Sequence, residues 1–108
     1  MISHIVLFRP RPDLTADARD AIVAAFESAL RDIPSIRGAR VGRRILHGRP
    51  YEALMKDDFP YAAVIEFDDI AGLTAYLEHP SHEQLATRFF MALEQALIYD
   101  FDLKNAAY

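Results

Sequence analysis

The chain has 108 residues, of which 52% are hydrophobic and 26% charged, a size and composition typical of one globular domain. It has no cysteine, which excludes disulfides and thiolate chemistry, and its net charge of −4 argues against a nucleic-acid binder. No apolar run has the roughly 18–20 residues that cross a bilayer, and the first residues lack the pattern of a signal peptide. We therefore expect one cytoplasmic domain over residues 1–108, with no membrane or nucleic-acid partner.

The first half of the chain predicts a strand, a helix and a second strand. Residues 2–9 carry apolar side chains on both sides of a two-residue period, which indicates a strand with both faces covered. A helix is expected between its N-cap Thr15 and Pro34, because apolar residues recur on one face at helical spacing. Residues 36–47 predict the second strand, interrupted by two glycines.

The connection over residues 48–60 is longer than a hairpin loop and rich in apolar groups. We expect a short helical segment there that lies over another surface. Residues 61–67 are almost continuously apolar, which is typical of a central strand.

Two helices and a strand are expected in the last third. Asp69 is the predicted N-cap of a helix that stops at Pro80. Ser81 is the predicted N-cap of a third helix, with Gln84 three residues later as in a capping box. A final strand is expected over residues 96–103.

This order of elements is typical of an α+β, ferredoxin-like β-α-β-β-α-β protomer with all helices on one face of its sheet. The other face would leave apolar side chains in water. We expect a second copy to cover it, so that two sheets form a closed α/β barrel across a homodimer. That homodimer is expected to enclose a ligand-sized apolar cavity and to shelter the histidines.

His82, Tyr76 and His4 are the main candidates for chemistry. The start of a helix disfavours imidazolium, so His82 would stay neutral and could act as a general base. Tyr76 could donate a hydrogen bond to a developing enolate oxygen. His4 interrupts an apolar strand face and should either be hydrogen-bonded in the core or line a pocket. The ordinary alternatives are an exposed helix start for His82 and an aromatic at the edge of the core for Tyr76.

Other polar residues carry weaker signals. The spacing of His79 and His82 suggests a metal site, but Pro80 breaks the helix that would align the two rings. No phosphate-binding or dinucleotide motif is present, so we expect neither metal nor cofactor. His47 has no evident partner in the sequence and should be exposed. Five arginines between residues 37 and 49 could attract a carboxylate or phosphate, although a solvated strand edge or salt bridges across a dimer are the ordinary alternatives.

Four segments together resemble the stress-responsive dimeric α/β-barrel (Dabb) family over nearly the whole chain. They are His4-Ile5-Val6-Leu7-Phe8, Val64-Ile65-Glu66-Phe67, Tyr76-Leu77-x-His79-Pro80-x-His82 and Tyr99-Asp100-Phe101. The resemblance implies a homodimer, and it extends to a plant polyketide cyclase that needs no cofactor or metal. Carried over, the catalytic base falls on His82, the assisting tyrosine on Tyr76 and a pocket histidine on His4. We expect the substrate-binding residues to be His4, His79, Phe26, Val6 and Phe8. Phe26 departs from the cyclase, where we align a pocket tyrosine.

The resemblance implies a small-molecule-binding protein. Our leading hypothesis is a cofactor-independent cyclase or lyase that acts on a polyketide-like or other small apolar or aromatic carbonyl compound. His82 would remove an acidic α-proton while Tyr76 stabilises the resulting oxyanion. The alternatives are a non-enzymatic stress-responsive protein that only holds a ligand and, by analogy of fold alone, a cofactor-free monooxygenase.

Overall fold

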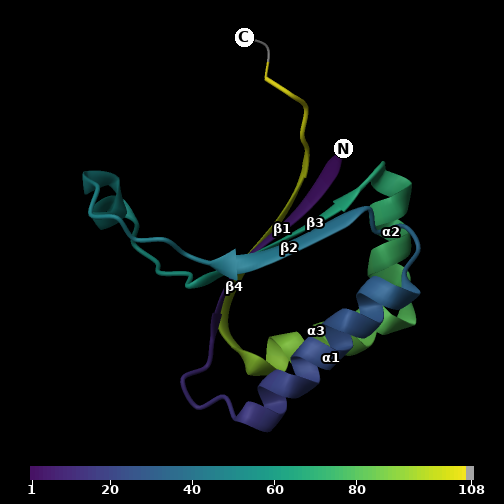
Figure 1. The fold of residues 1–108 in the computed structure, drawn as a ribbon, viewed down its shortest axis with the longest axis horizontal. Helices are drawn as coiled ribbons and strands as arrows, with labels where there is room; N and C mark the ends of the chain where they lie inside the picture. The colour runs from purple at the N-terminus through teal and green to yellow at the C-terminus, as the bar shows by residue number, and fades with distance from the viewer. Residues whose placement is uncertain (107–108) are drawn as a thin grey trace.

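A computed structural model describes residues 1–106 as one antiparallel sheet with helices packed on a single face (Figure 1). The elements in chain order are β1 (Ile2–Pro10), α1 (Ala16–Asp32), β2 (Gly38–Arg43), β3 (Tyr61–Phe67), α2 (Ile70–Glu78), α3 (Pro80–Ala92) and β4 (Leu93–Asp102). The four strands have the spatial order β2-β3-β1-β4. The expected ferredoxin-like α+β fold is confirmed, with β1 and β3 in the centre of the sheet. No helix in the described residues is long and apolar enough to span a bilayer.

The first two helices begin where the sequence predicts. The Thr15 hydroxyl accepts a hydrogen bond from the Ala18 backbone N–H at 3.1 Å, and the Asp69 carboxylate accepts one from Gly72 N–H at 2.8 Å. Each cap satisfies a backbone donor that the first helical turn would otherwise leave unpaired. Both N-cap predictions are confirmed.

The prediction for the start of α3 is wrong by two residues. The N-cap is His79, whose Nδ1 accepts a hydrogen bond from Ser81 N–H at 3.1 Å. Pro80 takes the first helical position, where its missing N–H and fixed φ are favourable. The Ser81 hydroxyl instead donates to the Asp32 carboxylate at 3.2 Å. His82 therefore lies third in α3, still within its first turn.

The second and fourth strands also differ from their predicted bounds. β2 ends at Arg43 instead of continuing to His47. Arg44 N–H still donates to the Pro60 carbonyl at 2.9 Å, but Pro60 has no N–H to return the bond, and β3 begins only after it. β4 begins at Leu93, three residues before the predicted start, so the chain passes from α3 into this strand without a loop.

Residues 44–60, which we call the arm, project beyond the sheet (Figure 1). The arm contains the expected short helical segment, a 3-10 turn over Pro50–Leu54. Within the protomer this turn is uncovered, since the Leu54 side chain is 74% exposed, and the expectation that it lies over another surface stays a prediction. The arm is held internally by the Glu52 carboxylate, which accepts from the backbone N–H groups of His47 and Gly48.

The two faces of the sheet have opposite environments (Figure 1). Ile2, His4, Val6 and Phe8 of β1 lie on the helix-covered face, because His4 contacts α2 and Phe8 contacts α3. The core lies on this side and includes Phe67, which is fully buried. The alternate residues form what we call the open face. Its apolar side chains, by strand register, are Ile5, Leu7, Ala62, Val64, Leu97, Tyr99 and Phe101.

Candidate functional site

The structure brings His4, Tyr76 and His82 together on the helix-covered face. The Tyr76 ring centroid lies 4.5 Å from that of His82 and 5.7 Å from that of His4. Tyr76 is thus the central member of the cluster, and its ring also packs against Phe67 at 5.2 Å. Tyr76 is 3% exposed and His4 6%, whereas His82 is half-buried. Water therefore reaches the cluster mainly from the His82 side.

The chain forms this cluster through the break between α2 and α3. Tyr76 lies in the last turn of α2, which closes when His79 N–H donates to the Tyr76 carbonyl at 3.2 Å. Pro80 then starts α3 in a new direction, because the residue before a proline is restricted to extended backbone. His82 N–H donates to the His79 carbonyl at 2.9 Å, which fixes the first turn of α3. The break is what places His82 beside Tyr76.

His4 has an acidic partner that the sequence reasoning missed. Its Nδ1 lies 2.5 Å from Oδ1 of Asp100 on the neighbouring strand β4. Since an ionised carboxylate can only accept, His4 Nδ1 carries the proton and Nε2 is left for another partner. Two features of the sequence could have indicated this pair. His4 is a polar residue on an apolar strand face, and Asp100 alternates with Tyr99 and Phe101 in the last strand. The expectation of a hydrogen-bonded core histidine is confirmed, because His4 is buried and bonded to Asp100. That His4 lines a pocket stays a prediction.

The environment keeps both His82 and Tyr76 in their neutral forms near pH 7. Burial lowers the pKa of His82, and the nearby His4 lowers it further, while the Leu77 backbone carbonyl and Glu83 oppose the shift. Burial also raises the pKa of Tyr76 to about 12. The sequence suggested a neutral His82 because of the helix start, whereas burial is the larger cause. A neutral imidazole can accept a proton, and a protonated phenol can donate a hydrogen bond.

The remaining predicted site residues are distributed along the same face. Val6 is buried next to His4 in β1, two residues farther along the strand. Phe8 stacks on Tyr61 at 5.5 Å and meets Phe89 edge-on at 5.0 Å. Phe26 packs from α1 against the hydrophobic core cluster. His79 is the N-cap of α3, so its Nδ1 is occupied by a backbone N–H, and only its Nε2 is free for a ligand.

The cluster is sheltered by its own chain, which corrects one expectation. We expected a second copy to shelter the histidines, but α2 and α3 of the same protomer already cover them. Two shallow surface hollows are present elsewhere, one along α3 lined by Glu83, Thr87 and Met91, and one lined by Arg11 and Glu94. Neither hollow is lined by His4, Tyr76 or His82.

The arginine-rich stretch is largely neutralised within the chain. Arg37 pairs with Asp68 at 2.8 Å, and Arg44 pairs with Asp58 at 2.6 Å. Arg40 pairs with Glu66 at 3.3 Å. Most of these arginines therefore already have a carboxylate partner, which weakens the case for an anion site.

The remaining histidine considered in the sequence is His47, and the remaining kind of site is a metal site. His47 is exposed as expected, but its Nε2 lies 2.6 Å from the Tyr51 hydroxyl, so the expectation that it has no partner is wrong. Within residues 1–106, no group of three or more histidine, aspartate or glutamate side chains is arranged to hold a metal ion.

Comparison with known proteins identifies relatives by family and by fold. The family model described as "Stress responsive A/B Barrel Domain" matches residues 2–103. No curated protein sequence matches the chain. A hydroxynitrile lyase from Passiflora edulis is 20% identical, with a TM-score of 0.81 over 99% of this chain and 96% of that one.

Two bacterial structures are also similar. A dimeric ferredoxin-like protein of unknown function from Thermobifida fusca is 24% identical, with a TM-score of 0.72 over 94% of this chain and 90% of that one. A Dabb family protein from Mesorhizobium loti is 23% identical, with a TM-score of 0.72 over 96% and 97%. At such identities the likeness to all three structures demonstrates the fold.

Proposed function

The chain belongs to the stress-responsive A/B barrel family, and on that premise we propose that it is a homodimeric, small-molecule-binding protein that acts as a cofactor-independent lyase or cyclase. The observation that carries the proposal is the contact of His4, Tyr76 and His82 on the helix-covered face. The substrate is a small apolar or aromatic carbonyl compound, because apolar side chains such as Val6 and Phe8 continue the same face.

The proposed reaction begins with His82 as general base. Its lowered pKa leaves the imidazole neutral at pH 7, ready to accept a proton from the carbon next to the substrate carbonyl. The electron pair of that C–H bond moves to the carbonyl oxygen as an enolate. The Tyr76 hydroxyl, protonated because its pKa is about 12, donates a hydrogen bond to this oxygen. In a cyclase reaction the enolate carbon then attacks a second carbonyl carbon of the same molecule, which forms a C–C bond and turns that carbonyl oxygen into an alkoxide. The imidazolium returns the proton to this alkoxide, so His82 is neutral again and nothing else is consumed.

His4 and Asp100 have a supporting role in this scheme. Asp100 fixes the His4 ring through Nδ1, and the His4 ring meets Tyr76 edge-on. A fixed neighbour limits the orientations of the Tyr76 ring, so that its hydroxyl is held ready for the substrate oxygen. Pre-oriented donors stabilise a developing charge without reorganising during the reaction.

The homodimer is proposed from the open face. Several large apolar side chains lie there without cover from any helix, including the half-exposed Tyr99 and Phe101. Contiguous apolar patches of this kind mark interaction surfaces. The dimeric state of the Thermobifida fusca structure supports the same arrangement. In this scheme the second copy stabilises the fold and leaves the cluster to its own protomer.

A second candidate function, ligand storage without turnover, is favoured by one observation. The Tyr76 ring packs against both histidine rings of the cluster, and the two surface hollows are lined by other residues. A protein whose cluster opens only to hold a ligand would need aromatic contacts with that ligand but would transfer no proton. The two functions differ in whether the ligand exchanges its α-protons.

Deuterium exchange distinguishes them even while the natural substrate is unidentified. A panel of aryl alkyl ketones and arylacetaldehydes, which carry α-protons, is incubated with the protein in D2O, and loss of the α-proton signals is followed by NMR. Cleavage of an aromatic hydroxynitrile, in which the same base would take the hydroxyl proton as cyanide leaves, is followed by aldehyde absorbance. Wild-type protein should accelerate one of these reactions, and His82→Gln should reduce the rate about 10²–10⁴-fold. His47→Gln, in an exposed histidine of the arm, is the matched control and should keep the full rate. Binding with no exchange or cleavage would favour storage, and equal rates in His82→Gln would refute its role as base.

A further inference from the structure

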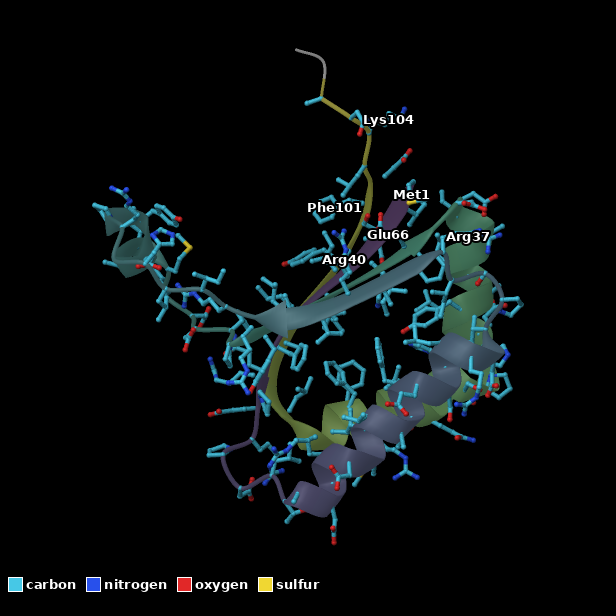
Figure 2. All side chains as sticks on the ribbon, in the orientation of Figure 1. Met1, Arg37, Arg40, Glu66, Phe101 and Lys104 are labelled. Carbon is cyan, nitrogen blue, oxygen red and sulfur yellow. The ribbon has the colours of Figure 1, made fainter. Side chains whose placement is uncertain are left out.

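The open face carries charged groups at one end, beside its apolar rows. Strand register places Gly38, Glu66, Ser3 and Phe101 in one row across β2, β3, β1 and β4. Arg40 begins the next row, and its guanidinium lies 3.3 Å from the Glu66 carboxylate. Figure 2 shows Arg40, Glu66 and Phe101 on the side of the sheet away from the helices. This end of the face therefore presents one base and one acid next to an aromatic side chain.

The Arg40–Glu66 pair has unused hydrogen-bonding capacity. Arg40 makes a single contact, through one terminal nitrogen, and its side chain is 77% exposed. A guanidinium has five N–H donors, so most of those of Arg40 face outward. Glu66 receives Arg40 on Oε1, and its side chain is 27% exposed, so its second oxygen has room for another donor.

Arg9, at the opposite end of the open face, provides the contrast. Its donors bond to the Glu94 carboxylate at 3.2 Å, the Asp58 carbonyl at 2.8 Å and the Gln95 amide oxygen at 2.7 Å. All three nitrogens of the Arg9 guanidinium thus have a partner within the chain, whereas only one nitrogen of Arg40 has one. An ion pair whose arginine is largely exposed contributes little to stability, so Arg40 gains little from its intrachain partner.

We infer that Arg40 of each protomer pairs with Glu66 of a second copy, and that these two reciprocal contacts set the register of the face-to-face dimer. The inference rests on the homodimer proposed above and names the charge contact that makes it specific. In a two-fold symmetric interface, residue i meets residue j and residue j meets residue i. A face that carries both a negative and a positive side chain can therefore pair with a second copy of itself. Two copies together form a closed set of two arginines and two glutamates.

Burial of the apolar rows makes these contacts necessary. Covering Ile5, Leu7 and Val64 with any surface also removes water from the adjacent charges, which is costly unless they acquire new partners. A second copy supplies a carboxylate for Arg40 and a guanidinium for Glu66. A slipped or inverted pairing of the two sheets would leave these charges buried without partners or would place like charges together, and both arrangements are unfavourable. The ion pairs would thus select one register of the two sheets among several that bury the apolar side chains.

The test compares single charge reversals with their mixture. Arg40→Glu and Glu66→Arg each place like charges at both contacts of a homodimer, so each should raise the dimer dissociation constant about tenfold or more in sedimentation equilibrium. Mixing the two variants restores an opposite-charge pair at both contacts between chains, while each chain keeps its own like-charge pair. With one variant isotopically labelled, native mass spectrometry should show heterodimers well above the statistical 1:2:1 ratio expected for random exchange. Intrachain pairing alone cannot produce that excess.

Controls separate this contact from general effects of charge. Arg37→Glu mixed with Asp68→Arg reverses an ion pair that flanks β2 and β3 outside the open face, and this mixture should remain statistical. Circular dichroism shows whether a charge reversal impairs folding, and Arg40→Gln and Glu66→Gln are the milder variants for that case. Each should raise the dimer dissociation constant and make that constant less dependent on salt concentration. A wild-type dimer whose reversal variants mix statistically would overturn the register contact alone. A wild-type monomer at micromolar concentration would overturn both the contact and the proposed homodimer, while the exchange reaction would still report on the cluster.

Discussion

His4 Nδ1 and Asp100 Oδ1 lie 2.5 Å apart, although the two residues are 96 positions apart in the chain. The contact joins the first strand to the last, next to the ring of Tyr76. It explains how a histidine can be buried on an apolar strand face, since burying a polar group costs free energy unless that group is hydrogen-bonded. It also makes the orientation of the cluster depend on the closing strand of the sheet.

Asp100→Asn should loosen His4 without changing the fold. The amide can still accept a hydrogen bond but carries no charge, so the bond becomes weaker and the preference for a proton on Nδ1 falls. We expect a loss of about 1–2 kcal/mol in unfolding free energy, at the lower end for a charged hydrogen bond because the Asp100 side chain is 40% exposed. Urea denaturation measures the stability, and long-range 1H–15N NMR reports the tautomer of His4. Asp102→Asn, two residues along on the same strand, is the control and should leave the His4 tautomer unchanged; an equal change in both variants would contradict the positioning role.

The pKa of His82 predicts how stability depends on pH. Because the pKa is lower in the folded state than its ordinary value of 6.5, the unfolded chain binds this proton more readily. The contribution of the neutral ring is therefore fully present above pH 6.5 and decreases as the pH falls from 6.5 towards the lower folded pKa. We expect the difference in unfolding free energy between wild type and His82→Gln to shrink between pH 7.5 and 5.5, as measured by urea denaturation. A constant difference over that range would mean that the His82 pKa is not lowered by folding.

Tyr76→Phe should separate chemistry from packing. The ring remains in place against Phe67 and His82, so the unfolding free energy should change by no more than about 1 kcal/mol. Loss of the hydroxyl removes the donor to the developing oxyanion and should reduce the rate of exchange or cleavage about 10²-fold. Tyr51→Phe, which alters an exposed tyrosine of the arm, should keep the wild-type rate. An unchanged rate in Tyr76→Phe, with the fold intact, would exclude the hydroxyl from the reaction.

Local patterns in the sequence determined most of the elements. The two-residue period of β1, the continuous apolar run of β3 and the caps Thr15 and Asp69 were predicted because each depends on neighbours within one turn or strand. The order of these elements then limited the topology to one that is confirmed, with β1 and β3 central. The motif from Tyr76 to His82 was visible for the same reason, since its residues lie within two adjacent helical turns.

Only the tertiary structure decided the partners of these residues. Asp100 was overlooked because its contact with His4 depends on the register of two strands at opposite ends of the chain. The end of β2 depended on whether Pro60, just before the facing strand, could return a hydrogen bond. The cap of α3 depended on the choice between His79 and Ser81, two polar side chains on either side of Pro80. The shelter of the histidines by α2 and α3 also required the packing of helices on the sheet. Sequence periodicity shows which side chains share a face, whereas only the packed chain shows what that face meets, because contacts between distant segments are set by register and packing together.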